Sequence, residues 1–188
     1  MFFLKELWVP IALSALACFI LSALAWTVAP HHQGEWKRLP TEPDVLDALR
    51  KDLPKPGLYA FPFAMRNEME RADVKVAFER GPVGYIAIAN RRRPSMPRML
   101  AAMALYFAVI STVVGYVAWE ASPFPKLGAP PMHVARITFL FSLFAYAAAA
   151  LPDSVWFGRP WRAFFGQLVD AFLYAIATAA LFATLWPL

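Results

Sequence analysis

The sequence has little charge and almost no cysteine. Only 16% of its 188 residues are charged, and Cys18 is the single cysteine. A lone thiol excludes an intrachain disulfide, and the lack of a CxxC pair excludes a structural zinc site built from cysteines. Because Cys18 lies inside a long apolar run, we interpret it as a small residue at a contact between helices.

Familiar catalytic and cofactor motifs are missing as well. The sequence contains no Walker loop, no GxSxG and no HExxH pattern. No histidine lies within a long apolar run, which excludes a bis-histidine haem between membrane helices. The sequence has no internal repeat and no pair of interrupted apolar runs, which are the features that would indicate a transporter. The sequence alone therefore discloses an architecture but no biochemical activity.

What the chain has in excess is apolar sequence. Hydrophobic residues make up 60% of it, against about 45–50% in a soluble domain. They gather in four runs, at residues 8–29, 99–118, 134–151 and 168–186. Each run meets or nearly meets the roughly 20 apolar residues that a spanning helix needs. We predict a membrane all-α fold, a bundle of four transmembrane helices.

The first run also has features of a cleaved signal peptide. Ala23 and Ala25 form an A-x-A pattern of the kind found at cleavage sites. However, Glu6 weakens the basic region that would precede a signal peptide, and apolar residues continue to Ala29. We predict that residues 1–29 form a retained first transmembrane helix.

A long connection, residues 30–98, separates the first and second spans. Its hydrophobic periodicity and breaker residues predict a short helix at 42–53, a strand at 58–63, a helix at 72–80 and a strand at 83–89. We predict a small α+β extramembrane domain inserted between helices 1 and 2. Residues 99–188 then hold the other three spans, with an interfacial loop at 152–164.

Basic residues are distributed unevenly between the two sides of the predicted bundle. Of the 18 lysines and arginines, 15 lie in the loops 30–98 and 152–164, and three lie on the side of the termini. The positive-inside rule then predicts that the long loop is cytoplasmic and that both termini lie outside, although a loop of this length can be translocated despite its charge. We interpret the net charge of +5 as a topological signal and not as a nucleic-acid footprint.

The stretch HHQGEW, residues 31–36, follows the first span directly. His31, His32 and Glu35 are candidate ligands for a zinc or copper ion, since imidazole and carboxylate groups both bind these metals. The alternative is a polar turn at the membrane surface that water, lipid headgroups or the folded loop satisfy.

Two carboxylates are predicted at the edge of the membrane on the same side. Asp170 lies about one turn inside the fourth run, and Asp153 follows the third. Ionisable residues in membrane segments are costly and are candidates for function. A local ion-pair network with Arg159 and Arg162 is the alternative to a proton or substrate role.

The loop between the third and fourth spans combines large aromatic residues with arginine. This composition is typical of a segment that lies on lipid headgroups, and equally of a protein-docking surface. We expect Pro152 to end the third helix. The candidate interfacial or interaction residues are Trp156, Phe157, Arg159, Trp161 and Arg162.

Small residues recur at helical spacing along the spans, for example Ala171, Ala175 and Ala179. Such stripes allow membrane helices to approach closely. They predict a compact monomer, self-association or contact with other membrane subunits.

The chain resembles a family of small four-span proteins from bacterial inner membranes that has no assigned function. The resemblance rests on the segments HHQGEWKRLPTEPDVLDALR, KPGLYAFP, GPVGYIAI and LPDSVWFGRPW and covers most of the chain. It implies a multi-pass protein of the bacterial inner membrane and transfers no catalytic residue. Our leading hypothesis is a non-enzymatic accessory, assembly or interaction component of a membrane complex. The alternative is a membrane-embedded metal-binding or catalytic protein that uses His31, His32 and Glu35.

Overall fold

A computed structural model of the protein describes residues 2–52, 55–89, 95–123 and 126–188. The expected last residue of the helix at 42–53 and the basic residues 91–93 lie outside the described residues. The described chain divides into two units. One holds the long apolar helices, and the other holds most of the segment between the first two of them.

Four helical segments are long and apolar enough to cross a membrane, which confirms the predicted fold class. They are α1 (Phe2–Thr27), α4 (Met96–Ala121), α5 (Pro131–Ala147) continued by α6 (Ala150–Trp156), and α7 (Trp161–Thr184). Each helical segment begins before its predicted apolar run because helical backbone continues through polar residues at the membrane edge, such as Lys5 and Glu6 in α1, whereas α1 and α7 end two residues before their runs do. The protein is therefore a multi-pass membrane protein.

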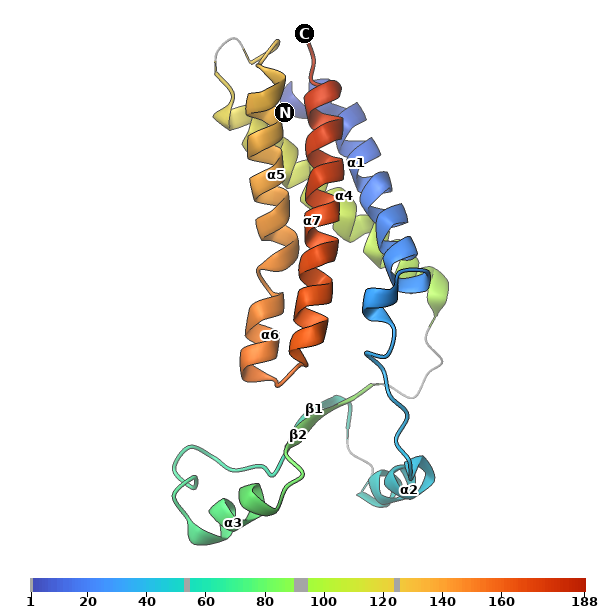
Figure 1. The fold of residues 1–188 in the computed structure, drawn as a ribbon, viewed down its shortest axis with the longest axis vertical. Coiled ribbons are helices and arrows are strands. Elements are labelled where there is room, and N and C mark those ends of the chain that lie inside the picture. Colours follow the sequence, from blue (N-terminus) through green and yellow to red (C-terminus); the bar gives the residue numbers. More distant parts are fainter. Residues whose placement is uncertain (1, 53–54, 90–94, 124–125) are drawn as a thin grey trace. The chain divides into compact units, whose positions relative to one another are not determined.

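The four spans close into a ring in which α1 packs against α4 and α7, and α5 packs against the same two helices. Figure 1 shows the start of α1 and the end of α7 at one end of this bundle. At that end Leu7, Ala118, Val134 and Phe182 form a buried apolar cluster. The opposite end therefore holds the end of α1 and the start of α7.

Small residues lie at the helix contacts, as predicted. The Sγ atom of Cys18 is buried 3.5 Å from Oγ1 of Thr178, so Cys18 lies at the contact of α1 with α7. A Cβ atom added to Gly115 in α4 would lie 3.1 Å from the ring of Phe182 and 3.2 Å from Ile11. The predicted stripe on α7 is buried along its length, at Ala171, Ala175 and Ala179.

The third span does not end at Pro152, and that expectation was wrong. The helix is interrupted after Ala147 and resumes at Ala150 as α6. Pro152 thus lies in the first turn of α6, where the backbone N–H that proline lacks has no partner within the helix. Since α7 begins at Trp161, the expected loop at 152–164 shrinks to residues 157–160.

The second unit contains α2 (Glu42–Asp52), β1 (Gly57–Phe61), α3 (Ala72–Arg80) and β2 (Gly84–Ile88). The two strands pair antiparallel, with Tyr59 opposite Ile86. This is the predicted order of helix, strand, helix and strand.

The segment Trp156–Gly158 also groups with the second unit. The Tyr85 hydroxyl donates a hydrogen bond of 3.2 Å to the carbonyl oxygen of Trp156, and the rings of Tyr85 and Phe157 meet edge to face with centroids 5.7 Å apart. The strand residue Tyr85 therefore holds this segment by one hydrogen bond and one aromatic contact.

Candidate functional site

The candidate site begins where α1 ends. The chain leaves α1 at Thr27 and forms a single 3-10 turn, η1 (Pro30–His32), that opens with proline. Proline suits the first position of a helical turn because its φ is already fixed near the helical value. Gly34 follows with a φ of 80°, a left-handed conformation that glycine adopts without strain. This backbone places His31, His32 and Glu35 beside the start of α7.

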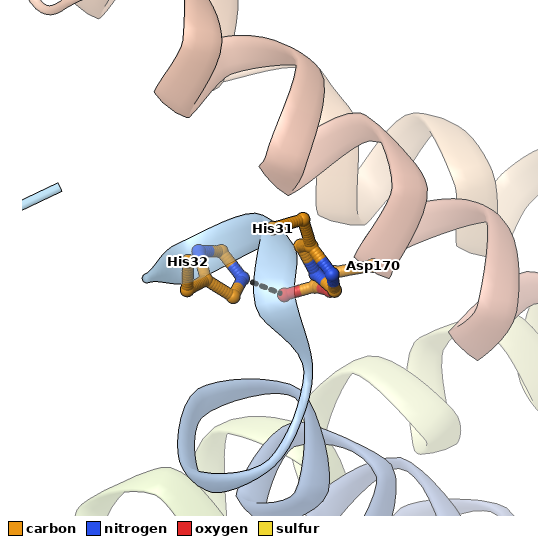
Figure 2. A group of neighbouring side chains, drawn as sticks. All are labelled: His31, His32 and Asp170. Carbon is orange, nitrogen blue, oxygen red and sulfur yellow. Dashed lines mark hydrogen bonds and ion pairs between the residues drawn. The ribbon is translucent and has the colours of Figure 1, made fainter. Parts of the chain in front are cut away.

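Both histidines of the turn meet one carboxylate on α7. The Nε2 atom of His31 lies 2.7 Å from Oδ1 of Asp170, and the Nε2 atom of His32 lies 2.8 Å from Oδ2. Figure 2 shows the two rings, from η1, directed toward the Asp170 side chain. The side chains of His32 and Asp170 are 2% and 7% exposed and that of His31 is 24% exposed, so solvent reaches the cluster from the His31 side.

A second layer of polar groups surrounds the far side of His32. Its Nδ1 atom lies 2.6 Å from Oε1 of Glu35, and Nη2 of Arg159 lies 3.5 Å from the other oxygen of Glu35. With the amide of Gln167 oriented to satisfy both groups, its oxygen accepts from the Arg159 guanidinium at 2.7 and 3.1 Å. Arg162 donates to the Gln33 carbonyl oxygen at 2.9 Å. Arg159, just before α7, and Arg162, in its first turn, thus bind the segment that carries the histidines.

Two neighbours give the cluster its shape. The ring of Trp26 stacks on that of His32, with centroids 4.0 Å apart and planes 7° from parallel. On α7, a Cβ atom at Gly166 would lie 3.5 Å from atoms of His31, His32 and Glu35. A larger side chain at this position would therefore enter the space that these three residues occupy.

The surroundings of His32 act on its pKa in opposite directions. Burial lowers the pKa because it disfavours the charged ring, but the hydrogen bonds to Asp170 and Glu35 outweigh burial and raise the pKa above its ordinary value. A neutral imidazole has only one N–H, whereas both ring nitrogens of His32 face carboxylates. Protonation of the ring, which these carboxylates favour, gives it an N–H for each of them.

The same atoms form a potential metal-binding group. One ligand atom from each of His31, His32 and Asp170 lies within 4.8 Å of the others. Ligands about 2.0–2.1 Å from a tetrahedral zinc ion are about 3.3 Å apart, so small side-chain movements are sufficient to accommodate an ion. Three protein ligands leave one position open, as in catalytic and not in structural zinc sites.

A cavity of about 310 Å³ adjoins the cluster inside the bundle. It shares Asp170 with the histidine cluster, and Gln167 and Asp153 also contribute to its wall. Half of the other lining residues are aromatic: Trp26, Tyr106, Phe107, Tyr146 and Tyr174. The cluster therefore borders an internal space large enough for a small organic molecule.

The structure brings together residues that the sequence analysis had treated in two groups. Asp170 meets both histidine rings, whereas Glu35, the expected third ligand, faces the other nitrogen of His32. Arg159 pairs with Glu35 and not with Asp170. Within the described residues, the expected network of Asp170 with the arginines is therefore replaced by the histidine pair.

The other interfacial candidates are exposed. Trp156, Phe157 and Trp161 are 74%, 50% and 54% exposed. Arg162 is also exposed, although it donates a hydrogen bond to the Gln33 carbonyl oxygen. Arg159 differs from them because it is part of the histidine site. Sequence spacing gave no sign of this difference, since the contact joins residues 124 positions apart.

The fold and the site define a four-span integral membrane protein with a histidine–aspartate cluster at one end of its bundle. Comparison with protein-family models, curated proteins and solved structures found no match to the chain.

Proposed function

We propose that this membrane protein binds a divalent transition-metal ion of the zinc class through His31, His32 and Asp170. The observation that carries the proposal is the convergence of both Nε2 atoms on one buried carboxylate. Two imidazoles and a carboxylate are a donor set that zinc accepts in catalytic sites. The proposal favours the metal-binding alternative of the sequence analysis, with Asp170 in the place of Glu35.

Glu35 fits the role of a positioning residue for this ion. A histidine that ligates a metal usually donates its other ring N–H to a carboxylate, which fixes the ring orientation and raises its basicity. Glu35 lies 2.6 Å from Nδ1 of His32 and is itself paired with Arg159. This order of groups leaves the Nε2 atom of His32 for the ion.

The charges near the site also favour a dication. Glu35, Asp153 and Asp170 are carboxylates that are buried or half-buried, and Arg159 is the partly buried cation beside them. A dication and one guanidinium offset three carboxylates while the ligating histidines remain neutral. Since uncompensated charge is costly at a membrane edge, a bound dication balances these carboxylates while both histidines stay neutral.

The test is metal binding by the purified protein in mild detergent. We expect one zinc per chain in the wild type and loss of that zinc in His31→Ala/His32→Ala. His133→Ala is the matched control, because His133 is half-buried and, among the described residues, its ring bonds the carbonyl oxygen of Ala121 and takes no part in the His31–His32–Asp170 cluster. Equal zinc retention by all three proteins would contradict the proposal.

A second candidate function is an interaction component of a membrane complex. It is favoured by the exposed apolar surface of the second unit, where Trp36, Phe63 and Val83 are 87%, 73% and 60% exposed and no residue of α3 is buried. Exposed apolar surface of this kind marks interaction sites. Affinity purification in mild detergent tests this role, and a chain that is recovered alone at every detergent concentration would count against it.

A further inference from the structure

The cavity beside the histidine cluster has two kinds of wall. Tyr106, Phe107, Tyr146 and Tyr174 present aromatic rings, with the Tyr146 and Tyr174 centroids 5.2 Å apart and those of Phe107 and Tyr174 5.5 Å apart. These pairs are edge to face, the arrangement that aromatic rings prefer. A planar ring bound here would pack against the edges and faces of these aromatic side chains.

The cavity lining also contains polar side chains, two of them carboxylates. Asp153 and Asp170 contribute carboxylates, and the hydroxyl of Tyr174 lies 3.5 Å from Oδ2 of Asp170. An ionised carboxylate accepts hydrogen bonds and donates none. A hydroxyl group suits this part of the lining, because it donates a hydrogen bond to a carboxylate and accepts one from a group such as the Gln167 amide.

The charge of the ligand follows from the proposed function, on which this inference rests. With a dication bound, the three carboxylates near the site are offset by the ion and Arg159. An ammonium group would add an uncompensated positive charge, whereas an uncharged hydroxyl would not. A hydroxyl oxygen can also act as a ligand to the ion at its open coordination position.

We propose that this cavity binds a hydroxylated aromatic ring, of the phenol or quinol class, with its oxygen directed to the metal. The volume of about 310 Å³ lies at the lower end of the about 300–1,000 Å³ of ligand pockets and suits a single substituted ring. Access is from the bundle surface, since Trp26, Met103 and Tyr106 line the cavity and are 46%, 40% and 43% exposed.

The test uses the full-length protein in detergent with cobalt in place of zinc, because the absorption spectrum of cobalt reports a new ligand. The probes are phenol, toluene, which lacks the oxygen, and cyclohexanol, which lacks the planar ring. We expect saturable spectral change with phenol and at least about tenfold weaker effects with both analogues, the factor that corresponds to about 1.4 kcal/mol. Hydroquinone with and without a decyl chain distinguishes a lipid-borne ligand from a free one, because only the former gains affinity from the chain.

Two variants separate the cavity from the metal site. Ala149→Phe places a ring in the cavity wall and is expected to weaken phenol binding at least about tenfold by steric exclusion, with cobalt affinity unchanged. Tyr116→Phe removes a hydroxyl from a tyrosine outside the cavity and is expected to change neither.

Three results would overturn the inference in distinguishable ways. Cobalt that binds but does not respond to phenol leaves the metal site standing and excludes the ring ligand. Equal binding of phenol, toluene and cyclohexanol shows a nonspecific apolar cavity and also excludes the inference. A protein that binds no cobalt overturns the metal site and, with it, the ligand.

Discussion

The Asp170 carboxylate lies 2.8 Å from the Nε2 atom of His32, although 138 residues separate the two in the sequence. The contact closes the bundle at the end opposite the termini, where the turn after α1 meets the first turns of α7. Because both groups are buried, each needs a partner. The proposed ion is that partner when it binds between them, and a shared proton is the partner when it does not.

Glu35→Gln tests the positioning role. The variant keeps the size of the side chain but weakens the acceptor for the Nδ1–H of His32. We expect zinc affinity to fall by about 10–100-fold while the stoichiometry stays at one, the range found for partners of metal-ligating histidines. Competition with a chelator of known affinity measures the change.

The control is Glu42→Gln, which should leave zinc affinity unchanged, since the partner of Glu42 among the described residues is the exposed Arg38. Unchanged affinity in Glu35→Gln would remove Glu35 from the site.

The metal-free and zinc-bound proteins should respond to pH in opposite directions. The pKa of His32 is raised in the folded state, so the protonated ring stabilises the fold fully below its unfolded pKa of about 6.5. This stabilisation is lost as the pH rises through the raised value. Zinc requires the deprotonated ring, so zinc affinity rises over the same interval.

Thermal unfolding in detergent measures both trends. The metal-free wild type should lose stability relative to His32→Asn as the pH rises through this interval, and added zinc should reverse the loss. A constant stability difference between the two proteins at all pH values would contradict the protonated state assigned to His32.

Gly115→Ala tests the helix packing apart from the site. The added Cβ would lie 3.1 Å from Phe182 and 3.2 Å from Ile11, so neighbouring side chains must shift. We expect a destabilisation of about 1–3 kcal/mol, typical of overpacked cores. Ala104→Val is the control, since Ala104 lies on an exposed face of the same helix, and it should unfold like the wild type.

The orientation of the protein in the membrane is still a prediction from charge. A reporter fused at residue 60 should give a cytoplasmic signal, because 15 of the 18 lysines and arginines lie in the connections 30–98 and 152–164. Fusion after Leu188 should give the opposite signal. A non-cytoplasmic signal at residue 60 together with a cytoplasmic signal after Leu188 would show that the long loop is translocated despite its charge.

The spans and the order of elements in the long loop could be predicted because they follow from local patterns. Apolar runs mark membrane helices, and breaker residues such as Pro56 and Gly81 lie between the short elements. The ends of the spans were less predictable. Pro152 was expected to end a helix and instead lies in the first turn of one, because proline is compatible with a helix start.

The site was predictable only in part. His31, His32 and Asp170 could each be selected, the histidines by their adjacency and the aspartate by its place in an apolar run. Four antiparallel spans also required them to lie on the same membrane face. Asp170 and not Glu35 is the carboxylate that both histidines share because of the geometry of η1 and because Gly166 has no side chain. Neither property can be deduced from the spacing of residues in the sequence.

X-ray absorption at the zinc edge tests the central claim most directly. The zinc-loaded protein should show nitrogen and oxygen ligands at about 2.0–2.2 Å, with the outer-shell scattering of two imidazole rings. Asp170→Asn should lose the bound zinc, and Asp153→Asn should retain the wild-type spectrum. Zinc that gives the spectrum of the hydrated ion, or that binds Asp170→Asn as tightly as the wild type, would contradict the assignment of His31, His32 and Asp170 as its ligands.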